Sequence, residues 1–182
     1  MRILAFLFLL VAPLAGADVN ICVRSYSQIP GPVEDEAKTT ARRLFDQIGV
    51  ELRFACDSEA VALRILAEAP GDTDGYAMGI ASVGGGNERR ASIFYNRVME
   101  FARNSVGHRN GILLGYVIAH EIGHILRGDP AHAPFGVMKA CWGRADAAAM
   151  VAGSVGFTRF DAERIFRVMA RRKQASSDAS VD

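Results

Sequence analysis

The chain has 182 residues, half of them hydrophobic, and carries 21 basic and 20 acidic side chains for a formal net charge of +1. This length suits one domain with enough apolar material for a core. The balanced charge, with no run of Lys and Arg among aromatic residues, argues against a nucleic-acid partner.

Residues 1–17 have the pattern of an export signal peptide. Arg2 precedes an apolar stretch over residues 3–11 that is too short to span a bilayer, and small residues at the end of the signal predict cleavage near Asp18. No later stretch has the ~18 uninterrupted apolar residues of a membrane span. We therefore expect an exported protein, periplasmic or secreted, without membrane contact once the signal is removed.

Five stretches after the signal predict β-strands, because they are apolar or alternate between apolar and polar residues. They are 21–26, 50–54, 60–66, 76–83 and 91–95. The Ala-rich stretch 60–66 could also form a helix, and Gly79 marks 76–83 as an edge strand or a bulge.

Five other stretches predict helices from apolar residues at helical spacing and from capping residues. They are 33–48, a short helix at 98–102, 110–127, 146–151 and a terminal helix that begins after Thr158. The helix at 33–48 lies between two predicted strands and completes an N-terminal β-α-β unit. The small, polar residues 174–182 are expected to be disordered.

Together these elements predict an α+β fold in a single domain over residues 18–173. We expect a mixed, twisted sheet of four or five strands, an N-terminal β-α-β unit, a long central helix and a small helical C-terminal part. The sequence contains no internal repeat that would indicate a second domain.

Three cysteines, Cys22, Cys56 and Cys141, allow one disulfide in an exported protein. If Cys22 begins one strand and Cys56 ends a parallel neighbour, they would lie ~15 Å apart, which is beyond bridging range. The sequence therefore favours a disulfide between Cys56 and Cys141.

The sequence H-E-I-G-H at residues 120–124 brings two potential metal ligands and a potential base into about one helical turn. On a helix, residues i and i+4 share a face, so His120 and His124 can bind one cation. Glu121 lies beside them, where it can accept a proton from a metal-bound water without binding the metal. Because the preceding stretch 112–119 is apolar, we expect a buried helix that leads into this segment.

A catalytic zinc needs three protein ligands and an open position for water. His132 is the expected third ligand, because Gly128 ends the helix and Pro130 stiffens a turn that returns the chain to the helix end. The chain has four histidines and three of them fall within 120–132, which argues against scattered structural histidines. Carboxylates remain alternatives for the third position: Asp129, Asp146 and Glu163.

The segment 120–132, followed by G-V-M at 136–138, resembles the metzincin clan of zinc metallopeptidases. In that clan a third histidine follows a glycine turn, and a methionine turn supports the site from below. Here Gly128 and His132 follow His124 by four and eight residues, which is longer than the usual spacing, and the methionine follows sooner than in most members.

The resemblance implies a zincin-like fold and a monomeric, exported endopeptidase that hydrolyses peptide bonds through a zinc-activated water. One catalytic Zn²⁺ would be held by His120, His124 and His132, with Glu121 as general base. The resemblance also implies that the edge strand at 76–83 aligns an extended peptide or protein substrate. Candidates for a hydrogen-bond donor to the transition state are Tyr116, His108 and Tyr95.

Two other functions remain open. One is a zinc-stabilised binding domain without catalysis, and the other is a zinc hydrolase of a non-peptide amide such as a cell-wall linkage. Three histidines beside a free glutamate favour catalysis over a structural site, because structural zinc sites are usually closed by four ligands.

Overall fold

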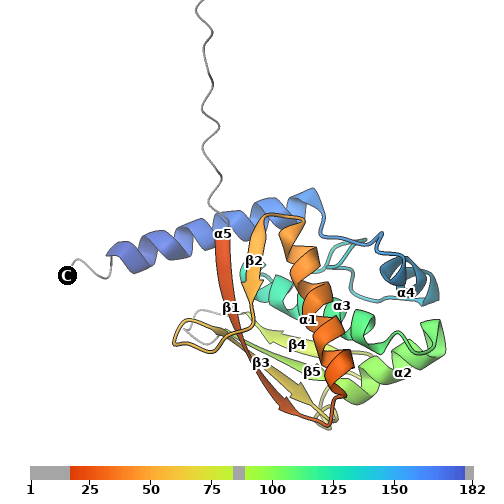
Figure 1. Cartoon of the computed structure of the whole chain (residues 1–182). Helices are drawn as coiled ribbons and strands as arrows, with labels where there is room; N and C mark the ends of the chain where they lie inside the picture. The colour runs from red at the N-terminus through yellow and green to blue at the C-terminus, as the bar shows by residue number, and fades with distance from the viewer. Residues whose placement is uncertain (1–16, 84–88, 179–182) are drawn as a thin grey trace, which may run out of the picture.

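The structure is a computed structural model and describes residues 17–83 and 89–178. It contains one five-stranded sheet and five helices, which Figure 1 shows in chain order. The strands are β1 (Ala17–Tyr26), β2 (Val50–Arg53), β3 (Val61–Leu66), β4 (Gly79–Ser82) and β5 (Arg90–Phe94). The helices are α1 (Gly31–Asp46), α2 (Tyr95–Val106), α3 (Asn110–Arg127), α4 (Arg144–Val151) and α5 (Arg159–Asp178). The predicted signal peptide lies outside the described residues, except for Ala17 at the start of β1.

The sheet is mixed and has the strand order β2-β1-β3-β5-β4. Strands β1, β2, β3 and β5 run parallel to their neighbours, whereas β4 pairs antiparallel with β5 and forms an edge. The N-terminal β-α-β unit and the α+β class are therefore confirmed. The stretch 60–66 forms a strand rather than a helix, because Val61, Leu63 and Ile65 alternate into the core.

The central helix α3 is buried along almost its whole length, from Leu113 to Arg127. It packs closely against α1, because a Cβ on Gly115 would lie 2.5 Å from Thr40 Cβ and 2.6 Å from the backbone oxygen of Ala37. Only a glycine allows the two helices to approach to this distance at that point. The helix also contacts the edge strand β4 and its neighbour β5.

The disulfide prediction is wrong, because the bridge joins Cys22 to Cys56 with a Cα–Cα distance of 4.4 Å. Strand β1 begins five residues before Cys22, and the short strand β2 pairs only with its first part, so that Arg53 lies opposite Asn20. The chain beyond β2 therefore comes level with Cys22 rather than a strand length away from it. Cys141 is free and exposed.

The first part of the tail that was expected to be disordered is helical. Helix α5 continues to Asp178, so residues 174–178 are helical, and 179–182 lie outside the described residues. The helix begins with a reciprocal cap, in which the Thr158 hydroxyl accepts the Asp161 N–H and the Asp161 carboxylate accepts the Thr158 N–H. In the part of the chain that is described, no helix combines the length and hydrophobicity needed to cross a bilayer.

Candidate metal centre

Two histidines lie on one face of α3 near its C-terminal end, as the i, i+4 spacing predicts. His120 and His124 are 8 % and 5 % exposed, because the helix that carries them is enclosed by the sheet and by α1. The helix ends at Gly128, which adopts the left-handed conformation (φ 61°) that only glycine takes without strain. This turn directs the following residues back over the helix end.

His132 lies beside the two helical histidines, on the returning segment. The potential ligand atoms of His120, His124 and His132 all lie within 4.8 Å of one another. The His132 ring is exposed, and its centroid lies 5.2 Å from that of His120 and 4.8 Å from that of His124. The predicted three-histidine cluster is therefore present, with one side open to solvent.

The alternative carboxylate ligands are engaged elsewhere and are not part of this cluster. Asp129 pairs with Arg164 at 2.9 Å, and Asp146 pairs with Lys139 at 2.7 Å. The third alternative, Glu163, pairs with an arginine one helical turn away at 2.9 Å. His132 is thus the residue that the structure brings to the third position.

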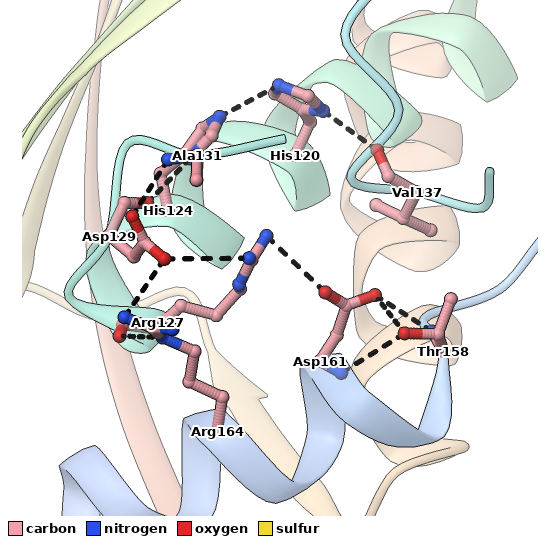
Figure 2. Close-up of polar contacts among 9 residues, drawn as sticks. All are labelled: His120, His124, Arg127, Asp129, Ala131, Val137, Thr158, Asp161 and Arg164. Carbon is pink, nitrogen blue, oxygen red and sulfur yellow. Dashed lines mark hydrogen bonds and ion pairs between the residues drawn. The ribbon is translucent and has the colours of Figure 1, made fainter. Parts of the chain in front are cut away.

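Each of the two helical histidines is hydrogen-bonded to a backbone carbonyl, as the dashed lines in Figure 2 show. His120 Nδ1 lies 2.7 Å from the oxygen of Val137, and His124 Nδ1 lies 2.9 Å from the oxygen of Asp129. Because a carbonyl oxygen only accepts, both Nδ1 atoms carry the proton. Each Nε2 therefore presents a lone pair, and these two atoms face each other at 3.0 Å.

Two facing lone pairs cannot form a hydrogen bond with each other, but both can bind the same cation. In a tetrahedral zinc site with Zn–N bonds of about 2.0–2.1 Å, neighbouring nitrogens are about 3.3 Å apart, close to the observed separation. Burial lowers the pKa of His120 to about 3 and also lowers the pKa of His124 and His132. All three imidazoles are thereby kept neutral, which is the form that binds metals.

Glu121 points into the same cavity as the histidines without joining their cluster. Its side chain is buried, and Oε2 has no hydrogen-bond partner among the described residues. Burial raises the pKa of this carboxyl to about 8, since little water is present to stabilise its charge. A neighbouring cation would favour the ionised form and so offset this effect.

The cavity above the histidines has a volume of about 390 Å³. One wall is the loop that leads into β4 together with β4 itself, and the opposite wall is the segment 139–142. Two aromatic residues also line it: Tyr76, which is 92 % exposed, and Trp142, whose ring meets His120 edge-on at 5.3 Å. A tyrosine in a polar loop carries no sequence signal of its own, so only the fold reveals its position.

The three predicted donor candidates do not reach this cavity. Tyr116 is fully buried, and its hydroxyl donates to the oxygen of Val155 at 2.9 Å. Tyr95 and His108 are not among the residues that line the cavity.

A methionine packs against helix α3 at Gly123. Met138 is fully buried, and a Cβ on Gly123 would lie 2.5 Å from its Sδ atom. The backbone N–H of Ala133 donates to the Met138 oxygen at 2.7 Å, which joins the methionine segment to the residue after His132. The methionine and the third histidine are therefore held in one compact loop.

Helix α5 contacts the loop at residues 128–132 that carries His132, here called the ligand loop. Two charged residues of α5 form ion pairs with two charged residues at or just before the start of this loop, as Figure 2 shows. The Asp129 carboxylate accepts the Ala131 N–H at 2.9 Å and pairs with Arg164 of α5. Arg127, at the end of α3, lies 3.3 Å from Asp161 of α5 and 3.9 Å from Asp129. Since Asp129 also provides the carbonyl that orients His124, this network connects α5 to the metal ligands.

Comparison with known protein families finds no matching family, and comparison with curated proteins finds no similar sequence. The site geometry is consequently the basis for any functional conclusion.

Proposed function

We propose that this protein is an exported, zinc-dependent endopeptidase with Glu121 as its general base. The observation that carries the proposal is the pair of facing Nε2 atoms of His120 and His124, each with its Nδ1 hydrogen-bonded to a carbonyl. With His132 they form a three-nitrogen set that suits Zn²⁺ and leaves a further position open toward the cavity. The disulfide between Cys22 and Cys56 supports export to an oxidising compartment.

Each residue has a defined task in this reaction. Bound Zn²⁺ supplies a Lewis acid that activates a water and polarises the scissile carbonyl. Glu121 accepts the proton of the water and delivers it to the nitrogen of the leaving amine. Val137 and Asp129 hold the two helical imidazoles in the tautomer that binds metal.

The free edge of the sheet offers a place for an extended substrate. The Phe94 N–H donates to the Met78 oxygen, so residues 78, 80 and 82 face β5, and the backbone groups of Gly79 and Ala81 point away from it. These groups lie at the cavity wall and can pair with the backbone of a peptide. A peptide bound there would run past Glu121 and the histidines.

The test is hydrolysis of a peptide library by the zinc-loaded protein, with and without a chelator, and with Glu121→Gln. We expect this variant to keep one zinc per chain and to lose about 10²- to 10⁴-fold in kcat, because it loses the general base. Glu163→Gln, the same change at an exposed position of helix α5, is the matched control and should retain full activity. Wild-type activity in Glu121→Gln would refute the proposal.

The same measurements separate the other functions. A non-catalytic binding domain would bind zinc stoichiometrically but cleave nothing in any library. A hydrolase of non-peptide amides would leave peptides intact and release amines from cell-wall fragments in a chelator-sensitive way.

The third ligand is tested by metal analysis. His132→Ala should lower the zinc content sharply, whereas His108→Ala, on an exposed histidine outside the cluster, should leave it unchanged. Undiminished zinc in His132→Ala would contradict the assignment.

A further inference from the structure

The edge strand β4 comes unusually close to Glu121 at its first residue. A Cβ on Gly79 would lie 2.6 Å from Oε1, 2.8 Å from Cδ and 2.8 Å from Cγ of Glu121. These separations are far below van der Waals contact, which is about 3.5–4.0 Å between carbons. The Glu121 side chain therefore occupies the space that any other residue at position 79 would fill.

Packing against β4 limits where this carboxylate can lie. Glu121 is 4 % exposed, and among the described residues Oε2 has no hydrogen-bond partner. Carboxylates in functional sites are commonly held by hydrogen-bonded neighbours, which fix their direction. Here the backbone of β4 on one side and α3 on the other enclose the side chain instead.

We propose that Gly79 is the positioning residue for Glu121: its missing side chain sets where the carboxylate lies relative to His120 and His124. This inference rests on the proposed function for its catalytic consequence, but the contact itself does not depend on that function. An alanine at position 79 would force either the carboxylate or the edge strand to move. Since a general base must lie within hydrogen-bond reach of the proton that it removes, either displacement lowers the rate.

The space around Gly79 also explains why a glycine stands in this strand. Glycine weakens a strand interior, and its φ here is not in the left-handed region, so backbone freedom is not the reason. The close approach of position 79 to the Glu121 side chain therefore explains why this position holds a glycine.

The test combines kinetics with unfolding. Gly79→Ala should keep the zinc content of the wild type but lose at least about tenfold in kcat, because a small misplacement of a reacting group is costly. KM should change less than kcat, because alanine keeps the backbone N–H and C=O groups that face the substrate. Gly71→Ala is the matched control, since a Cβ there has no heavy atom within 4 Å and the residue does not line the cavity.

The second measurement needs no activity. In the metal-free protein, Gly79→Ala should lower the Tm by roughly 2–12 °C, as expected for overpacking in a domain of this size. In the Glu121→Ala background, which removes the clashing side chain, the same change should lower the Tm much less.

Either of two results would overturn the inference: equal Tm losses in the two backgrounds, or wild-type kcat in Gly79→Ala. If the wild-type protein cleaves no peptide, the proposed function fails, and the unfolding measurements alone decide whether Gly79 positions Glu121.

Discussion

The buried ion pair between α3 and α5 allows a quantitative prediction for Asp161→Ala. Asp161 is fully buried, and its Oδ1 lies 3.3 Å from Arg127 Nη1. Its Oδ2 accepts the N–H of Thr158 at 3.0 Å and the Thr158 hydroxyl at 2.6 Å. The carboxylate thus neutralises a buried arginine and also caps the start of α5.

Two losses contribute to the expected effect. Removing one partner of a buried ion pair costs about 3–5 kcal/mol. In Asp161→Ala the buried Arg127 would keep only the more distant Asp129, at 3.9 Å, as a counter-charge. Loss of the helix cap costs about 1 kcal/mol more. We therefore expect Asp161→Ala to lower the free energy of unfolding by about 4–6 kcal/mol, which corresponds to roughly 10–20 °C in Tm.

Urea unfolding of the metal-free protein provides the assay, with Thr158→Ala as a control that removes only the capping contribution. Thr158→Ala should cost about 1 kcal/mol. The double variant Arg127→Met/Asp161→Ala should be more stable than Asp161→Ala alone, because no buried charge remains unpaired. The reasoning is refuted if Asp161→Ala costs no more than Thr158→Ala.

Three further predictions concern other parts of the fold. In metal-free protein, the contribution of Glu121 to stability should fall as pH rises from 4.5 to about 8, because folded Glu121 keeps its proton while the unfolded state has lost it. The three histidines have lowered pKa values and act in the opposite direction at acidic pH, so the Glu121 contribution is read as the difference between wild type and Glu121→Gln in urea titrations; the variant should gain on wild type as pH rises and be more stable by up to about 5 kcal/mol at pH 8. Gly115→Ala should destabilise the protein by at least about 1 kcal/mol despite the higher helix propensity of alanine, because the new Cβ meets the rigid backbone oxygen of Ala37; calorimetry would measure this change. Replacing Cys22 and Cys56 by serine should cost about 4 kcal/mol in denaturant unfolding, since the bridge closes a loop with a sequence separation of 34.

The alternation of apolar and polar residues predicted the main elements of the fold. Strand β3 shows why: Val61, Leu63 and Ile65 point into the core while their neighbours do not, so the period of two is directly visible in the sequence. The histidine pair was predictable for the same kind of reason, because the i, i+4 rule depends only on helix geometry. His132 followed from the glycine and proline that end the helix.

Features that depend on register or on distant contacts could not be predicted. The pairing of Cys22 with Cys56 depends on where β1 begins and on how short β2 is, and neither is encoded in the spacing of the cysteines. Helix α5 begins after Thr158, as predicted, but the small, polar residues 174–178 did not indicate that it continues to Asp178. The role of Gly79 was invisible because its contact, Glu121, lies on another element.

Because ion pairs with α5 hold the ligand loop, the histidine cluster is completed only when this C-terminal helix packs against the rest of the fold. The three histidines precede Asp161 and Arg164 in the chain. The ribosome therefore synthesises the histidines first, and it adds the α5 residues that hold the ligand loop about thirty residues later. A chain without α5 therefore contains all three histidines but lacks the two residues that pair with Arg127 and Asp129. Docking of this helix therefore couples the final arrangement of the three-histidine cluster to completion of the fold.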